Sequence, residues 1–385
     1  MSTKSRSHVD DLRGAGRLAV EATRGVTALV EAMHATIAGG PAIIGQPLAG
    51  PARAATGLIY GTVRGITALV GVGIDRALAQ LAPLLGSSVP GSEREAVLAA
   101  LNGVLGDYLL ETSNPLAIEM TLRRDGEPGS KLLVLVHGSS MSDRQWLQAG
   151  HDHGAALARE LGYTPIYVHY NSGLHVSTNG RALADQLERL VATWPVAIDE
   201  LVLLGHSMGG LVARSACHAG TDHAWRSHLR ALIALGTPHH GAPLERGGNW
   251  IELLLGISRY SAPLVRLAMI RSAGVTDLRY GNVLDEHWQA RDRFEHRADD
   301  RTPLPLPTGV RCYAIAGSLS PAAGARVRGD GLVPVTSALG IHARPELTLA
   351  FPEAHRAVAY GTGHIQLLGS LAVYDMLRNW LAASP

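Results

Sequence analysis

The segment Leu201-Val-Leu-Leu-Gly205-His206-Ser207-Met208-Gly209-Gly210 constrains the fold more than any other part of the chain. Four consecutive apolar residues are typical of a strand that is buried on both faces of a parallel sheet. A helix is expected from Met208. The turn between them is so short that Ser207 must adopt a strained backbone conformation, and side chains at Gly205 and Gly209 would clash with neighbouring chain. The segment therefore predicts a strand, a tight turn that presents a serine hydroxyl, and a helix.

The same alternation of strands and helices runs through residues 116–385. Besides the strand at 201–204, apolar runs predict strands over 118–122, 132–136, 164–168, 231–235, 310–316 and 347–351, and a final helix over 366–381. Helices between successive strands are typical of parallel sheets. This part of the chain is therefore predicted to be an α/β domain with a mostly parallel, doubly wound sheet.

Residues 1–115 have a different pattern and predict an N-terminal helical extension. Apolar residues recur at helical spacing over 26–37 and 66–81, and a further helix is expected after Pro90-Gly91. The polar faces are not rich in Lys and Arg, unlike those of helices that lie on a membrane surface. A helical layer that packs on the main domain or on a second subunit is favoured, with peripheral membrane contact or a substrate-facing role as the alternatives.

Composition excludes several classes of protein. The 385 residues contain 34 Lys and Arg against 33 Asp and Glu, so the net charge of +1 lacks the basic excess of a dedicated nucleic-acid binder. Two cysteines, Cys217 and Cys312, are too few for a disulfide framework or a Cys-based zinc site. The N-terminus has no apolar run of the signal-peptide kind, and Gly and Pro interrupt the longest early uncharged stretch. We therefore expect a cytoplasmic protein.

A serine presented in this way can act as a nucleophile if backbone N–H groups stabilise the oxyanion that its attack creates. One such donor is expected to be Met208, the residue after the serine. The other should come from the loop after an earlier strand. The apolar run at 132–136 leads directly into His137-Gly138-Ser139-Ser140. We assign the second donor to the backbone N–H of Ser139.

The base should be a histidine beyond the turn, oriented by a carboxylate. His364, in Gly361-Thr362-Gly363-His364 just before the last helix, is the best placed of the 18 histidines. Asp330, in Gly329-Asp330-Gly331, precedes it and gives the order Ser, Asp, His. The competing histidines are His239, His240, His342 and His355, and the competing carboxylates are Asp277, Asp285 and Glu353.

These motifs together resemble the α/β-hydrolase superfamily. The ordered set consists of a strand followed by His137-Gly138, Gly-His-Ser-Met-Gly-Gly at 205–210, Gly-Thr-Pro-His-His-Gly at 236–241, Gly-Asp-Gly-Leu-Val-Pro at 329–334, and Gly363-His364. The likeness covers roughly residues 116–385 and is strongest to lipases and esterases, including the group with a GPI-inositol-deacylase-like domain. It implies Ser207, Asp330 and His364 as a catalytic triad, with Ser139 and Met208 forming the oxyanion hole.

The segment 245–305 lies between two predicted core strands and contains two apolar patches. In this superfamily such an insertion resembles a helical cap over the active site, which could supply a pocket for an acyl chain. Both helices could instead be ordinary buried structure. The residues expected to line the substrate cleft are His239, His240, Trp250, Leu254 and Leu267.

The sequence thus predicts a serine hydrolase that cleaves carboxylic esters, with a lipid-like substrate and with neither a metal nor an organic cofactor. An acyltransferase or a thioesterase with the same triad is an alternative, since pocket shape selects the acyl acceptor. A membrane-associated binding or scaffold protein with an inactive hydrolase domain is an alternative of another class, which an intact triad pattern disfavours. Neither a nucleic-acid partner nor a particular oligomeric state is predicted.

Overall fold

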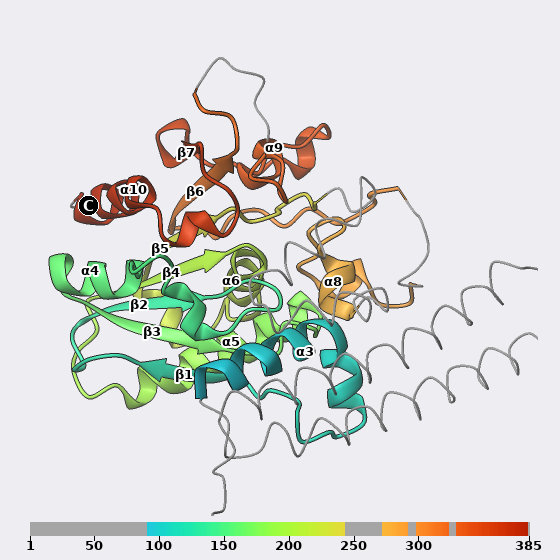
Figure 1. Ribbon diagram of the computed structural model, residues 1–385, viewed down its shortest axis with the longest axis horizontal. Helices are drawn as coiled ribbons and strands as arrows, with labels where there is room; N and C mark the ends of the chain where they lie inside the picture. Colours follow the sequence, from blue (N-terminus) through green and yellow to red (C-terminus); the bar gives the residue numbers. More distant parts are fainter. Residues whose placement is uncertain (1–90, 243–271, 292–297, 323–328, 384–385) are drawn as a thin grey trace, which may run out of the picture.

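A seven-stranded sheet forms the centre of the protein (Figure 1). The computed structural model describes residues 91–242, 272–291, 298–322 and 329–383. The strands are β1 (Thr121–Arg124), β2 (Lys131–Val136), β3 (Tyr163–His169), β4 (Glu200–His206), β5 (Leu229–Leu235), β6 (Arg311–Ser318) and β7 (Arg356–Tyr360). Their order is β1-β3-β2-β4-β5-β6-β7, and only β1, which is antiparallel to β3, departs from a parallel arrangement. The prediction of a mostly parallel sheet is therefore confirmed.

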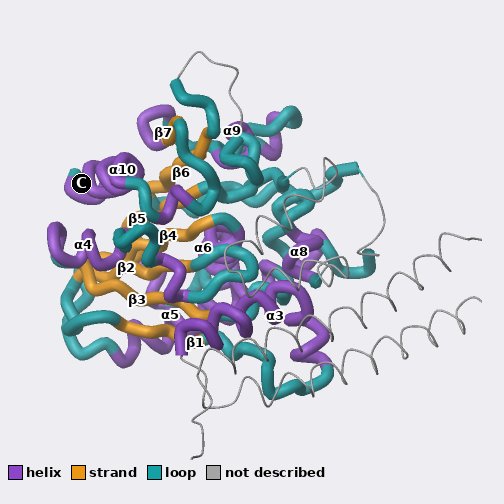
Figure 2. Tube along the Cα trace, viewed as in Figure 1, coloured by secondary structure: helices purple, strands orange, loops and turns teal. Residues whose placement is uncertain are grey.

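Helices cover both faces of the sheet (Figure 2). Two helices, α5 (Val176–Thr193) and α6 (Met208–Ala219), pack on one face, and α4 (His153–Leu161) and α10 (Leu371–Ala382) pack on the other. Successive residues of each central strand point to opposite faces of the sheet, so that Leu203 packs in the cluster with α6 and Leu204 packs in the cluster on the other face. Burial on both faces explains why these strands are continuous apolar runs in the sequence.

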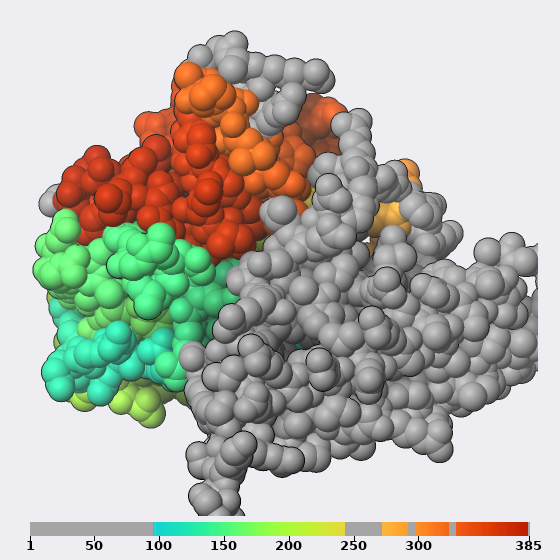
Figure 3. Space-filling model, viewed as in Figure 1, coloured from blue at the N-terminus to red at the C-terminus, as the bar shows by residue number. Residues whose placement is uncertain are grey.

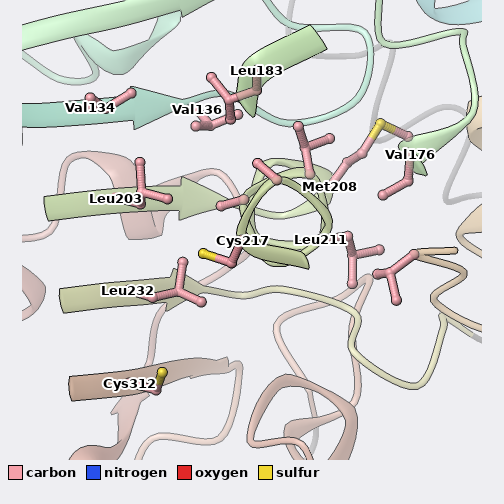
Figure 4. Close-up of a cluster of buried hydrophobic side chains, with 14 of the residues drawn as sticks. Val134, Val136, Val176, Leu183, Leu203, Met208, Leu211, Cys217, Leu232 and Cys312 are labelled. Atoms are coloured by element: carbon pink, nitrogen blue, oxygen red, sulfur yellow. The ribbon is translucent and has the colours of Figure 1, made fainter. Parts of the chain in front are cut away.

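The layer under α6 is the larger of the two cores. Figure 4 shows Val134, Leu203, Leu232 and Cys312, which come from four neighbouring strands. Their side chains belong to one buried cluster with residues of α6, including Cys217. This packing fixes the position of α6 on the sheet, and hence that of the turn that joins β4 to α6.

One prediction near the C-terminus is wrong, and another has a different start. A strand was expected over 347–351, but that segment is a loop after a 3₁₀ turn, Pro345–Leu347. Its apolar residues Leu349 and Phe351 are buried in the core without belonging to the sheet. The seventh strand is instead β7, an edge strand that is only partly buried and therefore lacks a strong apolar run. The helix expected over 366–381 is present as α10, but it begins only at Leu371, after a 3₁₀ turn, Gln366–Leu368.

The C-terminal segment closes against the middle of the chain. In Figure 3 the red surface of the C-terminal region is continuous with the green surface below it. At this boundary a Cβ added to Gly369 would lie only 2.7 Å from the carbonyl oxygen of Gln148. The segment between β7 and α10, which contains His364, is therefore packed on the segment that follows β2.

Most of the predicted N-terminal extension and of the predicted cap lies outside the described residues. The described part of the extension is α3 (Gly91–Glu111), and that of the 245–305 insertion includes the short helix α8 (Ala273–Asp277). Trp250, Leu254 and Leu267 are not among the described residues, so the cap and the domain boundary at residue 115 stay predictions. Of the helices that the structure describes, none has the length and apolar character needed to span a membrane.

Candidate active site

The turn after β4 holds the backbone of Ser207 in a conformation that residues other than glycine rarely adopt. Its backbone has φ 54° and ψ −125°, and it directly precedes α6. A Cβ at Gly205 would lie 2.5 Å from the backbone of Gly210, and one at Gly209 would lie 2.1 Å from the carbonyl oxygen of Val136. Only glycine permits these approaches, so the two glycines of the motif allow the strand and the helix to meet at a sharp angle around Ser207.

A buried histidine and carboxylate form a second unit. His364 Nδ1 lies 2.7 Å from Asp330 Oδ2, and both side chains are almost completely excluded from solvent. The other carboxylate oxygen accepts backbone N–H bonds from Leu332 and Val333, at 3.0 and 2.8 Å. The His364 backbone N–H donates to the Asp330 carbonyl at 3.0 Å. This network orients the ring with Nδ1–H toward the carboxylate, which leaves Nε2 as the free basic nitrogen.

Gly236 shows how close the two units lie. The Ser207 backbone N–H donates to the carbonyl of Leu235, the residue before Gly236, at 2.8 Å. A Cβ on Gly236 would lie 3.3 Å from His364 Cε1 and 3.2 Å from Asp330 Oδ2. The buried Nε2 of His364 has no hydrogen-bond partner among the described residues. Ser207, Asp330 and His364 therefore converge at the carboxyl ends of β4, β5 and β6.

The turn after β2 also borders the serine. A Cβ on Gly138 would lie 3.0 Å from Ser207 Cβ, so the backbone of this turn passes directly beside the serine. Ser139 is fully buried, and its hydroxyl has no partner among the described residues. Met208 is the first residue of α6, and a helix leaves the N–H groups of its first turn without intrahelical acceptors. Met208 and Gly138, the residues adjoining Ser207 and Ser139 in the chain, thus lie beside the serine, and the role of the two N–H groups as oxyanion donors stays a prediction.

Burial keeps two histidines of this region neutral. Desolvation lowers the pKa of His206 well below its usual value, and the neighbouring His364 adds to the effect. Desolvation also lowers the pKa of His137 to about 3. His206 Nε2–H donates to the carbonyl of His364 at 3.0 Å. The histidine inside the Gly-x-Ser-x-Gly motif therefore holds the backbone of the candidate base, a role that the linear sequence did not reveal.

The rival candidates have other partners. Asp277 lies 3.0 Å from His175 Nδ1 and accepts from the Val176 backbone N–H, and Asp285 pairs with Arg181. His342 is 3.4 Å from Asp299, and His355 Nδ1 is 3.1 Å from the Cys312 carbonyl. Glu353 begins a 3₁₀ turn before β7. Within the described part of the chain, none of these groups is hydrogen-bonded to the side chain of His364 or of Ser207.

The two histidines expected in the cleft, His239 and His240, follow β5. His239 is buried, and its Nδ1 accepts from the Arg214 guanidinium at 3.3 Å. Desolvation, followed by the charge of Arg214, lowers its pKa well below the usual value. The His240 ring lies 4.8 Å from that of His342. Their contacts with substrate stay a prediction, because the remaining expected cleft residues lie outside the described residues.

A parallel sheet with a strained serine at the end of its central strand and a buried His-Asp pair beside it has the α/β-hydrolase fold. The protein resembles the lipases and esterases of this superfamily. Residues 127–302, somewhat less than half of the chain, match the family model described as the PGAP1-like alpha/beta domain.

Several solved structures are similar to the chain at low identity. The mature Bacillus licheniformis lipase BlEst2 is 18% identical, with a TM-score of 0.44 over 68% of this chain and 98% of that one. The esterase RhEst1 from Rhodococcus sp. ECU1013 is 17% identical, with a TM-score of 0.41 over 69% and 94% of the two chains. Aspergillus fumigatus lipase B is 13% identical, with a TM-score of 0.40 over 68% and 56%. No curated protein matches the chain in sequence. Likenesses at this level do not identify a substrate.

Proposed function

We propose that the protein is a serine hydrolase that cleaves carboxylic esters through Ser207, His364 and Asp330. The observation that carries the proposal is the 2.7 Å contact between His364 Nδ1 and Asp330 Oδ2, made beside a serine with φ 54°. A buried carboxylate that fixes the histidine tautomer is what a general base for serine requires. A backbone strained at the serine itself supports a catalytic rather than a purely structural role for the turn.

In the proposed reaction, His364 Nε2 accepts the hydroxyl proton of Ser207 as Oγ attacks the ester carbonyl carbon. The backbone N–H groups of Ser139 and Met208 stabilise the oxyanion. The tetrahedral intermediate collapses, the alcohol leaves with the proton from His364, and an acyl-Ser207 ester remains. Water, activated by His364, then attacks that ester and releases the carboxylic acid and the serine. Asp330 stabilises the imidazolium in both halves of the cycle.

We further propose that the acyl group is lipid-like. Leu147, Leu319 and Leu371 are each more than half exposed. Leu319 Cδ2 would lie 3.6 Å from a Cβ on Gly363, the residue before His364. Leu371 lies two residues beyond Gly369, which contacts Gln148, the neighbour of Leu147. Exposed apolar side chains at these positions, two on loops and Leu371 at the start of α10, suit an apolar acyl chain better than a charged one.

The test is hydrolysis of p-nitrophenyl esters from acetate to palmitate by the wild-type protein and by Ser207→Ala. We expect activity that rises with acyl length and is lost in the variant. An organophosphonate should add its mass to the peptide that contains Ser207 and to no other peptide. Retention of most of the activity in Ser207→Ala would exclude this mechanism. A preference for acetate over all longer esters would contradict the lipid-like substrate while leaving the mechanism intact.

A further inference from the structure

Helix α3 touches the turn that carries one of the proposed oxyanion donors. A Cβ on Gly103 would lie 2.7 Å from both Cα and Cβ of Ser140 and 2.0 Å from its Oγ. Ser140 directly follows Ser139 and has φ 58°, a conformation that is unfavourable for a serine. The backbone of α3 therefore lies against a strained part of this turn, with no room for a side chain between them.

The next turn of α3 makes a second close contact. A Cβ on Gly106 would lie 1.8 Å from Asn171 Oδ1, and one on Gly173 would lie 2.1 Å from the Asn102 carbonyl oxygen. Asn171 Nδ2 donates to the Gly106 carbonyl at 2.9 Å, and Asn171 Oδ1 accepts from the Gly173 backbone N–H at 3.0 Å. Residues 171–173, which follow β3, are thus fixed against α3 by hydrogen bonds as well as by packing.

The two contacts are linked through Ser172. Its hydroxyl accepts a hydrogen bond from the Ser140 backbone N–H at 2.8 Å, and both residues are buried. Helix α3 is itself anchored, because Asn102 donates to the Leu116 carbonyl at 2.8 Å and Ser272 donates to the Gly103 carbonyl at 2.6 Å. Figure 1 shows α3 beside α8, the helix that follows Ser272. The turn at 138–140 is therefore held between Ser207 and a helix that lies outside the family match at 127–302.

We propose that α3 positions the Ser139–Ser140 turn for catalysis, with Gly103 and Gly106 as positioning residues. The inference rests on the proposed function, since it concerns the placement of a donor that acts only when an oxyanion forms. Glycine is a poor helix former, so alanine at either position would favour α3 itself. The close contacts with Ser140 and Asn171 supply a reason for glycine at these two positions that helix formation does not.

The test is Gly103→Ala in the full chain, assayed with the preferred p-nitrophenyl ester. The added methyl group must displace Ser140 and with it the adjacent donor. We expect kcat to fall about 10- to 100-fold, because small misplacements of catalytic groups cost this much. KM should stay nearly unchanged, since the donor acts on the transition state. The double variant Gly103→Ala/Ser140→Gly removes the clashing Cβ and Oγ but not Cα, and its kcat should lie between those of Gly103→Ala and the wild type.

Gly154→Ala is the matched control for crowding. Gly154 is a helical glycine of α4, and its added Cβ would lie 2.7 Å from Tyr167 Oη. This variant should keep the wild-type kcat. An unchanged kcat in Gly103→Ala would overturn the inference, as would equal losses in Gly103→Ala and Gly154→Ala. If Gly103→Ala does not fold, Ser172→Ala is the alternative, because it removes the hydroxyl that accepts the hydrogen bond from the Ser140 backbone N–H. An unchanged kcat in that variant would equally overturn the inference.

The proposed function and this inference fail in different ways. An inactive wild-type protein, or a fully active Ser207→Ala variant, would refute the proposed function. A wild-type activity that depends on Ser207 but is insensitive to Gly103→Ala would leave the proposed function standing. That result would reduce α3 to a structural layer on the domain.

Discussion

Mild acidification should destabilise the protein strongly because four of its histidines are buried in the neutral form. His137, His153, His206 and His239 have almost no exposed surface. Desolvation is the main cause that lowers the pKa of His137 to about 3 and that of His153 to about 4. The same cause lowers the pKa of His206 and His239 well below the usual value. In the unfolded chain each would titrate near its usual pKa of about 6.5.

The sign of the effect follows from these directions. A histidine whose pKa is lowered by folding stabilises the protein above its unfolded pKa, and the stabilisation is lost as the pH falls toward the folded pKa. At pH 5.5, one unit below the unfolded value, each group costs about 1.4 kcal/mol. Four such groups would together remove about 5 to 6 kcal/mol of stability between pH 7.5 and 5.5. That is comparable to the whole unfolding free energy of many domains, about 5–15 kcal/mol.

Urea unfolding followed by tryptophan fluorescence at pH 7.5, 6.5 and 5.5 measures this loss. His153→Gln is the control, because the amide can replace the 2.9 Å hydrogen bond from His153 Nε2 to the Leu367 carbonyl without titrating. Its loss should be smaller than that of the wild type by about 1.4 kcal/mol. Carboxylates such as Asp143, whose pKa is lowered by His169 and Arg123 against the opposing effect of burial, titrate below this window. A wild-type change of less than about 1 kcal/mol would refute the reasoning.

Three further predictions concern the site and the sheet beneath it. Asp330→Asn should lower kcat roughly 10⁴-fold by favouring the wrong tautomer of His364, and ester hydrolysis within tenfold of wild type would contradict this. Ser207→Gly should be more stable to urea than Ser207→Ala by about 1 kcal/mol, because glycine relieves the strain at φ 54°. Equal stability would mean that the turn stores no strain. Leu203→Ala, at a fully buried position of β4, should cost about 2–5 kcal/mol in the same assay. A loss below about 1 kcal/mol would show that the core collapses into the cavity.

The central strands were predictable because burial on both faces leaves a continuous apolar run. The runs at 132–136 and 201–204 lie within β2 and β4, with edges that differ by one or two residues. Apolar character alone did not locate a strand where a buried segment is a loop or where a strand is only partly buried. Phe351 is buried but lies in a loop, whereas β7 begins with the half-buried Arg356. A local pattern reports burial, and it locates a strand only where the two coincide.

The candidate site was predictable in its residue types but not in its contacts. The order of Gly205-His206-Ser207, Asp330 and His364 along the chain follows from motifs. The bond from His206 to the His364 carbonyl joins positions 158 residues apart, and no spacing rule encodes it. The other histidines could be ranked only by position, since burial decides which of them stays neutral.

The contact between α3 and the turn at 138–140 shows why the packing around the candidate site could not be predicted from the sequence. Within a helical pattern, Gly103 and Gly106 look like two weak positions, because glycine opposes helix formation. Their significance depends on Ser140 and Asn171, which approach from loops after two different strands. The strained conformations of Ser140 and Ser207 persist because packing from several directions leaves the backbone no alternative. The role of such a glycine cannot be inferred before the position of its packing partner is known. The residues that hold a strained site in place are therefore harder to predict from sequence than the site residues themselves.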